Sequence, residues 1–305
     1  TRNDSKKLLQ KVSGKDMSMI INGKTGLTGL LGSPVSHSIS PLMHNEAFRL
    51  MGLNYAYLCF DVGAEDLKAA VDGLRVLNVR GFNCTMPDKN RMCEIADRLS
   101  PAAQIIGAVN TVVNDQGVLT GYNTDGIGYM KSVKAAGFHI IGKKMTLLGA
   151  GGAATAIASQ AALDGVSEIN IFSRKTKFWD RAGRLADTLN SRTDCKVSLY
   201  ELADTTSLKA SLKDSAILTN GTSVGMAPDM EHSLITEPEF FHEGLIVSDV
   251  IYNPRETMLM KLARENGCHT FNGLYMLYYQ GAEAFRLWTG MEMPEKEIKE
   301  KFFQP

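Results

Sequence analysis

The sequence has few cysteines, no net charge and no long apolar run. Its five cysteines are scattered, odd in number and form no Cys-x-x-Cys pair, so we expect neither a disulfide framework nor a metal site. The 33 basic and 33 acidic residues give a formal charge of zero, which argues against nucleic acid or an anionic membrane as a partner. No segment approaches the roughly 18 apolar residues of a membrane-spanning helix. These absences predict a reduced, cytoplasmic protein.

Length and composition indicate a globular protein of about two domains. The chain has 305 residues, of which 44% are hydrophobic, as is usual for a protein with a full apolar core. The segment from Thr1 to Asp16 is polar and lysine-rich. Because this segment has no apolar core, we expect a lead-in to the fold rather than a secretory signal.

A glycine-rich turn near the middle of the chain is the most informative local pattern. The apolar run Met145–Leu148 is followed at once by G-A-G-G-A-A, from Gly149 to Ala154. This order predicts a strand, a tight turn and a helix, and it fits the Gly-x-Gly-x-x-Ala pattern that holds a dinucleotide pyrophosphate. A helix N-terminus there would offer free N–H groups and a positive dipole end to the anion. A plain tight turn without a ligand is the alternative.

Strands alternate with helices on both sides of this turn, which predicts an α/β fold. The second half has the pattern of a doubly wound, Rossmann-type sheet. The aromatic-rich tail from Gly273 to Trp288 is expected to return to the first half. We therefore predict an N-terminal α/β substrate-binding domain over residues 1–124 with 273–305, and a dinucleotide-binding domain over residues 125–272.

Two serines precede the first predicted helix of the substrate domain. Ser40 and Pro41 suit the N-cap and the first position of that helix, and Ser38 lies in the loop before it. Hydroxyl groups beside a helix N-terminus suit a carboxylate ligand. The alternative is that Ser40 only caps the helix and Ser38 only stabilises the loop.

A lysine and an aspartate are candidates for proton transfer. Lys89 follows a strand-ending turn, where its ammonium can donate to a carbonyl oxygen and stabilise developing alkoxide charge. Asp125 could hold Lys89 in place or share proton transfer with it. The alternatives are a surface lysine and an aspartate that caps the next helix.

Seven ordered motifs together resemble the shikimate dehydrogenase family and, within it, the quinate/shikimate dehydrogenases. The resemblance extends from Gly32 to the end of the chain. The motifs that carry it are G-S-P-V-S-H-S-I-S-P-L-M-H-N from Gly32, N-C-T-M-P-D-K from Asn83, G-A-V-N-T from Gly107, G-Y-N-T-D-G from Gly121, G-A-G-G-A-A from Gly149, N-G-T-S-V-G-M from Asn220 and Y-Q-G-A-E-A-F from Tyr279.

This resemblance implies NAD(P)-linked interconversion of 3-dehydroshikimate and shikimate, or of 3-dehydroquinate and quinate. It implies a place either in the shikimate pathway of aromatic amino acid biosynthesis or in quinate catabolism. The catalytic pair of the family matches Lys89 and Asp125. The implied substrate-binding residues are Ser38, Ser40, Thr85, Asn110 and Gln280. The implied cofactor-binding residues are Gly149, Ala150, Gly151, Gly152, Ala153, Ser173, Arg174, Lys175, Thr222, Gly273 and Met276.

The segment after the second strand of the dinucleotide domain bears on the choice of cofactor. NAD enzymes usually have an acidic residue there for the ribose hydroxyls, whereas an arginine accommodates the 2′-phosphate of NADP. This chain has Arg174 and Lys175, and no acidic residue before Asp180. We therefore favour NADP as the cofactor, with NAD as the alternative.

Tyr275 stands where the family usually has glycine, and a tyrosine could narrow the nicotinamide pocket. We expect His37 and His44 to pack in loop and helix rather than to act in catalysis.

A non-catalytic nucleotide- or metabolite-sensing protein with this fold is the alternative function. A methylene-tetrahydrofolate type of dehydrogenase is disfavoured by the serine pair. The protein is expected to be a monomer or a homodimer.

Overall fold

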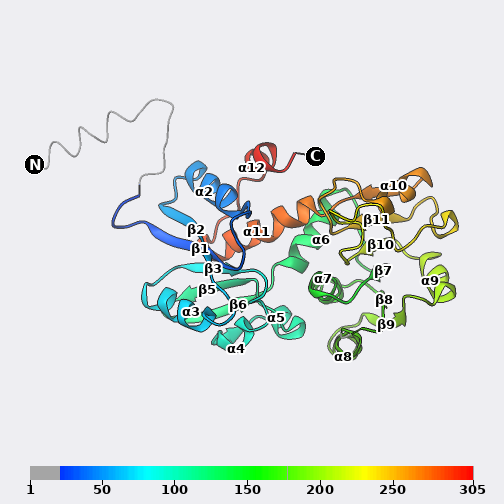
Figure 1. The fold of residues 1–305 in the computed structure, drawn as a ribbon, viewed down its shortest axis with the longest axis horizontal. Helices are drawn as coiled ribbons and strands as arrows, with labels where there is room; N and C mark the ends of the chain where they lie inside the picture. Colours follow the sequence, from blue (N-terminus) through cyan, green and yellow to red (C-terminus); the bar gives the residue numbers. More distant parts are fainter. Residues whose placement is uncertain (1–20, 177, 305) are drawn as a thin grey trace, which may run out of the picture.

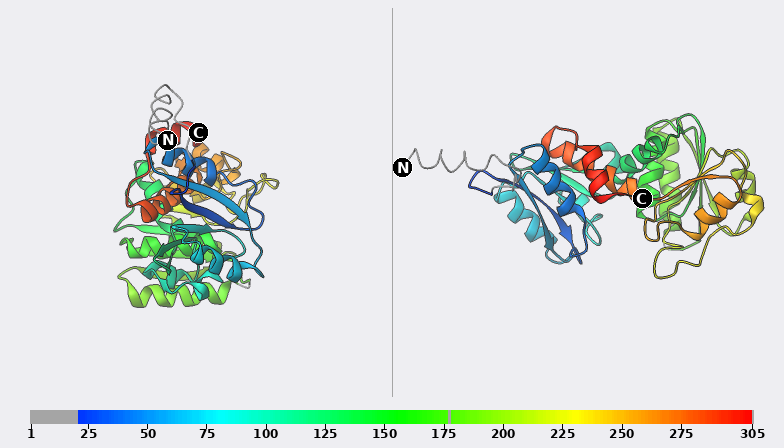
Figure 2. Two further views of the ribbon diagram at one scale, coloured as in Figure 1. Left: turned by 90° about the vertical axis from the view of Figure 1, so that its left-hand side faces the viewer. Right: turned by 90° about the horizontal axis from the view of Figure 1, so that it is seen from above.

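The computed structural model describes residues 21–176 and 178–304, which form two lobes joined by helices (Figure 1 and Figure 2). The polar lead-in expected over Thr1–Asp16 lies outside the described residues. Each lobe contains one six-stranded sheet. The last two helices, drawn in orange and red, lie on the N-terminal lobe, as the sequence predicts for the tail.

The N-terminal lobe has a mixed sheet with the strand order β2-β1-β3-β5-β6-β4. The β1 strand is parallel to β2 and β3, whereas β5 and β6 form an antiparallel hairpin next to β3. The strands of this sheet are β1 (Gly26–Gly32), β2 (Tyr55–Asp61), β3 (Gly81–Cys84), β4 (Arg98–Leu99), β5 (Thr111–Asp115) and β6 (Val118–Tyr122).

Helices cover both faces of this mixed sheet. Apolar residues of α2, α11 and α12 form one core with the sheet, around Phe48, Tyr57 and Trp288. Residues of α3, α4 and α5 form the core on the other face, around Leu67 and Phe82. The helices are α2 (Ser40–Leu50), α3 (Leu67–Val76), α4 (Met92–Ile95), α5 (Pro101–Ile106), α11 (Leu274–Thr289) and α12 (Glu295–Phe302).

The second lobe has an all-parallel sheet with the order β12-β11-β10-β7-β8-β9. Counted from the first strand of the lobe, this is the order 3-2-1-4-5-6 of the doubly wound dinucleotide fold, read in reverse. The predicted α/β fold is therefore confirmed. The strands are β7 (Lys144–Leu148), β8 (Glu168–Ser173), β9 (Lys196–Glu201), β10 (Ile217–Asn220), β11 (Ile246–Asp249) and β12 (His269–Phe271).

Helices pack on both faces of the parallel sheet. One core lies under α6, α7 and α8, and the other lies under α9, α10 and the short 3-10 helix Pro238–Phe240. These helices are α6 (Asp125–Ala135), α7 (Gly152–Leu163), α8 (Trp179–Arg192), α9 (Thr205–Leu212) and α10 (Met258–Glu265).

The two lobes are connected by α6 and α11, which pack closely against each other. A Cβ at Gly128 would lie 2.8 Å from the backbone nitrogen of Gln280 and 2.8 Å from the carbonyl oxygen of Met276, so a glycine is needed for this approach. The hydroxyl of Tyr129 on the same helix hydrogen-bonds with Ser248 of β11 at 2.9 Å. The start of α6 thus has a fixed position relative to both sheets.

Several elements differ from the sequence predictions. The turn at Met86 and Pro87 predicts a short helix that continues to Ala96. The helix is limited to α4, because the Lys89 carbonyl oxygen accepts a hydrogen bond from the backbone N–H of Val109 at 2.8 Å. The β9 strand was not predicted, and it is an edge strand with little full burial. The lysines and glutamates from Lys296 to Lys301 predict a solvated helix face. The segment is helical, but Ile298 on its inner face is fully buried.

Candidate active site

A cavity of about 550 Å³ lies between the two lobes and receives residues from both. Its walls include the ends of β1, β3 and β11 and the starts of α2, α6, α7 and α11. The structure brings together here all seven residues expected to bind substrate or act in catalysis, namely Ser38, Ser40, Thr85, Lys89, Asn110, Asp125 and Gln280.

The serine pair lies where the loop after β1 enters α2. The N-cap residue is Ile39, and Ser40 is the first residue of the helix without a side-chain capping bond. The expectation that Ser40 is the N-cap residue is therefore wrong, because the helix begins one residue earlier than predicted. Ser38 stabilises the loop instead, since its Oγ accepts a hydrogen bond from the Ser40 N–H at 3.2 Å. Both serine side chains line the cavity.

Lys89 and Asp125 form an ion pair on the wall of this cavity. Lys89 Nζ lies 2.7 Å from Asp125 Oδ2, and the two side chains are 25% and 17% exposed. Asp125 Oδ1 accepts a hydrogen bond from Asn110 Nδ2 at 2.8 Å. The two oxygens of the carboxylate thus have separate donors, which fixes the plane of the carboxylate and the direction of the lysine.

The position of Asp125 also differs from the capping alternative. Thr124 is the N-cap residue of α6, and Asp125 is the first residue of the helix. The acidic side chain suits the positive end of the helix dipole, yet its hydrogen bonds are to Lys89 and Asn110. Asp125 is therefore placed for the chemistry of the cavity rather than for capping.

Buried hydrogen bonds hold the amide of Asn110. Its Oδ1 accepts from the backbone N–H of Thr124 at 2.8 Å and from Thr111 Oγ1 at 3.0 Å. Its Nδ2 donates to Thr124 Oγ1 at 3.0 Å as well as to Asp125. The orientation of the amide is set by these partners, so Nδ2 faces the carboxylate.

Thr85 reaches the cavity because Gly32 leaves room for it. A Cβ at Gly32 would lie 2.3 Å from Thr85 Cγ2, and φ of Gly32 is +155°. Gln280 approaches from α11, with its Nε2 donating to the Leu277 carbonyl at 3.0 Å. Gln280 lines the same cavity, and its Oε1 accepts no hydrogen bond from the described residues.

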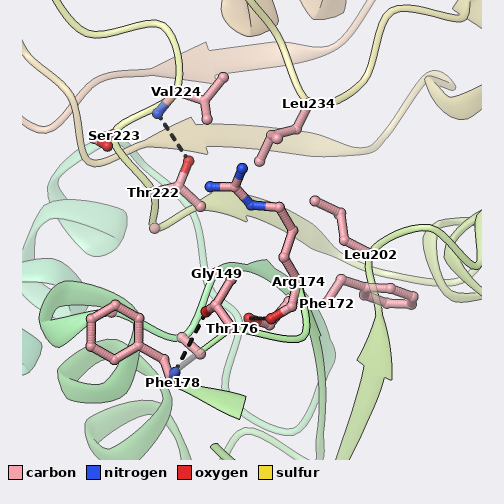
Figure 3. Close-up of a pocket in the computed structure, with 14 residues that line it drawn as sticks. Gly149, Phe172, Arg174, Thr176, Phe178, Leu202, Thr222, Ser223, Val224 and Leu234 are labelled. Atoms are coloured by element: carbon pink, nitrogen blue, oxygen red, sulfur yellow. Dashed lines mark hydrogen bonds between the residues drawn. The ribbon is translucent and has the colours of Figure 1, made fainter.

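A second cavity, of about 580 Å³, follows the glycine turn on the dinucleotide lobe (Figure 3). The turn lies between β7 and α7, as the sequence predicts. Gly149 has φ of +102°, and a Cβ there would lie 2.6 Å from Thr222 Cγ2. A Cβ at Gly151 or Gly152 would meet nothing within 4 Å. The start of α7 therefore faces open space, as a pyrophosphate would require.

The expected cofactor-binding residues are divided between the two cavities. Gly149, Ala150, Gly151, Ser173, Arg174 and Thr222 line the second cavity, whereas Gly152, Ala153, Gly273 and Met276 line the cavity that contains Lys89. The two groups meet at the start of α7, so an extended ligand can pass from one cavity to the other. Lys175 lines neither cavity, and its Nζ forms an ion pair with Glu201 at 2.8 Å.

Arg174 provides the positive charge of the second cavity. In Figure 3 its side chain extends from the end of β8 toward Thr222 and Leu234. Among the described residues that line this cavity, none carries a carboxylate. The donor set therefore fits a dinucleotide with a further anionic group near Arg174.

Tyr275 does not narrow the cavity beside Met276. It is absent from the described residues that line the cavity. Its ring instead packs beneath Lys299 of α12, with Nζ 4.1 Å from the ring centroid. Tyr275 thus joins the start of α11 to the last helix.

His44 packs in the core, as expected, and does not take part in the cavity. It is fully buried, and its ring stacks on Tyr57 with centroids 4.5 Å apart. Burial lowers the pKa of His44 to about 3, so the ring is neutral. His37 is exposed in the loop before Ser38.

Tyr252, Phe178 and Arg181 are among the cavity residues that were not identified from the sequence. Tyr252 follows β11, and its position beyond the carboxyl end of a parallel strand is a signal that could have been used. Phe178 and Arg181 come from the start of α8. Arg181 Nη2 donates to the carbonyl oxygen of Ile106 at 2.8 Å and so connects the lobes at one side of the cavity.

In residues 21–176 and 178–304, no group of three or more His, Cys, Asp or Glu side chains is placed to hold a metal ion. None of the helices in these ranges is both long enough and apolar enough to cross a membrane.

Comparisons with known proteins place this geometry in a family. The model of the shikimate dehydrogenase substrate binding domain matches residues 30–112, and that of the shikimate 5′-dehydrogenase C-terminal domain matches residues 273–301. A shikimate dehydrogenase (NADP(+)) of Listeria monocytogenes is 53% identical over 283 residues, which cover 93% of this chain and 97% of the relative. A quinate/shikimate dehydrogenase of Escherichia coli is 45% identical over 282 residues, or 92% and 98% of the two chains.

Solved structures agree with the sequence comparisons. A crystal structure of shikimate 5-dehydrogenase from Listeria monocytogenes, in complex with shikimate and NAD, superposes with a TM-score of 0.91 at 51% identity. The alignment covers 96% of this chain and 100% of that chain. The chain therefore belongs to the shikimate dehydrogenase family.

Proposed function

We propose that this chain is an NADP-dependent oxidoreductase that interconverts 3-dehydroshikimate and shikimate, and that also accepts 3-dehydroquinate and quinate. One observation carries the proposal. The Lys89–Asp125 pair lies in the same cavity as the two serines and the start of α7. The names of the relatives from Listeria and Escherichia coli support the same activity.

The serine pair is proposed to hold the ring carboxylate. The hydroxyls of Ser38 and Ser40 can each donate one hydrogen bond to a carboxylate oxygen. Thr85 and Gln280 are free to bond the ring hydroxyls from two other walls of the cavity. Asn110 can reach a ring hydroxyl by exchanging its hydrogen bond to Thr124 Oγ1, while its hydrogen bond to Asp125 is kept.

Lys89 and Asp125 are proposed as the catalytic pair. In the reductive direction, Lys89 Nζ donates a hydrogen bond and then a proton to the ring carbonyl oxygen, which becomes the hydroxyl. In the oxidative direction, the same nitrogen takes the hydroxyl proton. Asp125 keeps Nζ directed at the reacting oxygen and stabilises the charged ammonium, because its own position is fixed by Asn110.

The cofactor is proposed to lie along both cavities. Its pyrophosphate would be held by the turn from Gly149 to Ala153, and its nicotinamide end by Gly273 and Met276. When bound, a nicotinamide cofactor supplies or accepts the hydride, and the protein contributes orientation and charge stabilisation. Arg174 favours NADP, because its guanidinium can pair with a 2′-phosphate.

The domain limits and the cellular setting are proposed from the same features. Residues 1–124 with 273–305 would form the substrate domain, and residues 125–272 the cofactor domain. The five cysteines are all in the described part of the chain and all free, which favours the reducing cytoplasm. We propose a monomer or a homodimer for the quaternary structure.

A turnover assay distinguishes the proposed enzyme from a non-catalytic sensor with the same fold. Purified protein is mixed with shikimate and NADP+, and the absorbance of NADPH is followed while binding of each ligand is measured by calorimetry. We expect NADPH to accumulate at a rate proportional to the protein concentration. Binding of both ligands without any NADPH would instead identify a non-catalytic sensor.

A further inference from the structure

A smaller cavity, of about 330 Å³, lies directly behind the serine pair. Ser38, Ser40 and Thr85 line both this cavity and the one that contains Lys89. The smaller cavity is also lined by Arg255 and His37. Arg255 belongs to the loop between β11 and α10, so it faces the serines from the opposite lobe.

The larger cavity contains a lysine paired with a carboxylate, whereas the smaller cavity contains an arginine and no carboxylate among its described lining residues. The charge of Lys89 is offset by Asp125 at 2.7 Å. Arg181 lines the larger cavity but not the smaller one. Among the described residues that line the smaller cavity, Arg255 is the one side chain with a permanent charge. The end of the cleft beside the serines is therefore positive, although the chain as a whole is neutral.

A carboxylate bound at the serines needs such a charge. Hydroxyl groups are neutral donors, and moving an anion out of water is costly unless an opposite charge lies near it. The Arg255 guanidinium has no hydrogen bond or ion pair with any side chain in the described part of the chain. Its neighbour Glu256 is paired with Arg264, with Arg264 Nε at 2.8 Å from Glu256 Oε1. Arg255 can therefore bind an incoming anion without breaking an existing pair.

We propose that Arg255 determines specificity for the acid substrate by supplying the counter-charge to the carboxylate held by Ser38 and Ser40. This inference rests on the proposed function. Because Arg255 and the serines belong to different lobes, the substrate carboxylate joins the lobes when it binds. A guanidinium can donate two parallel hydrogen bonds to one carboxylate, which adds geometric selectivity to the charge.

The test compares shikimate with its neutral methyl ester. The variants are Arg255→Gln, which removes the charge, and Arg255→Lys, which keeps it. Lys261→Gln is the matched control, because Lys261 is an exposed cation on the nearby α10 that lines neither cavity. Initial rates are measured with each substrate at saturating NADP+, at low and at high ionic strength.

We expect Arg255→Gln to lower kcat/KM for the acid by about tenfold or more, as for a lost charge-assisted hydrogen bond. The loss should lie mainly in KM, because the carboxylate is bound equally in the ground state and the transition state. The ester should change less than about twofold by the same reasoning, and the KM for NADP+ should be unchanged. Arg255→Lys should recover part of the loss, and high salt should reduce the difference from the wild type.

Two outcomes would overturn the role of Arg255. Equal losses for the acid and the ester would mean that the residue acts through the fold rather than through the carboxylate. If Arg255→Gln leaves kcat/KM for shikimate unchanged, the serines, or His37 beside them, are sufficient to bind the carboxylate. In both cases an active wild type leaves the proposed function intact, whereas a wild type that oxidises neither shikimate nor quinate contradicts the proposed function itself.

Discussion

Lys89 Nζ lies 2.7 Å from Asp125 Oδ2, across the 36 residues of chain that separate the loop after β3 from the start of α6. The second oxygen of Asp125 accepts from Asn110 Nδ2 at 2.8 Å. The lysine is therefore oriented by a carboxylate that is itself held in place. This arrangement is what a proton donor needs in order to reach one oxygen of a bound ring reproducibly.

Replacement of Lys89 tests its role in proton transfer. We expect Lys89→Ala to lower kcat by about 10²–10⁴, the span of a lost acid or base group, with a much smaller change in shikimate affinity. Stopped-flow or steady-state kinetics with a parallel measurement of shikimate binding gives both quantities. A near-normal kcat would show that another group transfers the proton.

Replacement of Ser38 tests the carboxylate site. Ser38→Ala should raise KM for both shikimate and quinate, equivalent to roughly 1–3 kcal/mol of lost hydrogen bonding. The KM for NADP+ should barely change, because Ser38 lies on the other lobe from the glycine turn. Ser36→Ala is the control, since Ser36 is an exposed serine of the same loop that lines none of the described cavities. A change limited to the cofactor KM would contradict the assignment.

Replacement of Arg174 tests the choice of cofactor. Arg174→Asp should shift the ratio of kcat/KM values toward NAD, because it removes the partner of a 2′-phosphate and adds an acceptor for ribose hydroxyls. Lys213→Asp controls for the same change of charge at an exposed position of the same lobe outside the cavities. The proposed role of Arg174 is contradicted if kcat/KM of the wild type is already about tenfold higher with NAD than with NADP, a difference of roughly 1.4 kcal/mol.

The burial of His44 predicts that the free energy of unfolding falls at acidic pH. Burial lowers its pKa from 6.5 to about 3, and neither ring nitrogen has a hydrogen-bond partner among the described residues. Below pH 6.5 the unfolded chain therefore binds a proton that the folded chain does not, so stability is lost as the pH falls. Between pH 7 and pH 5 this one group should remove about 2 kcal/mol from the free energy of unfolding.

Urea titrations at the two pH values check this effect. His44→Phe should lose less free energy of unfolding than the wild type between pH 7 and pH 5, whatever its absolute stability at pH 7. His139→Gln is the control, because His139 is exposed and should keep the pH dependence of the wild type. Parallel pH dependence in the wild type and His44→Phe would show that the ring is protonated in the folded protein.

Local patterns predict much of this fold. The β7 strand contains the apolar run Met145–Leu148 and ends where the glycine turn begins, as predicted. The turn sequence from Asn114 to Gly117 predicts the hairpin of β5 and β6, and the structure has Gln116 and Gly117 there with φ of 54° and 90°. In both cases the information lies within about ten residues of the sequence.

Features that depend on contacts between residues far apart in the chain could not be predicted from local sequence patterns. The helix expected after Met86 is shortened by a hydrogen bond from Val109, and nothing local to Met86 encodes that partner. The position of Arg255 behind the serines depends on how the lobes are joined by α6 and α11. The motifs identify Lys89 and Asp125 as candidates, but their contact comes from the tertiary fold.

The central claim is that this chain oxidises shikimate with a nicotinamide cofactor, and one set of initial rates tests it directly. Shikimate and quinate are each offered with NADP+ and with NAD+, and kcat/KM is determined for all four pairs. We predict turnover of shikimate with NADP+, at a higher kcat/KM than with NAD+, and turnover of quinate as a second substrate. The absence of turnover in all four pairs, in protein that binds NADP+ normally, would contradict the account.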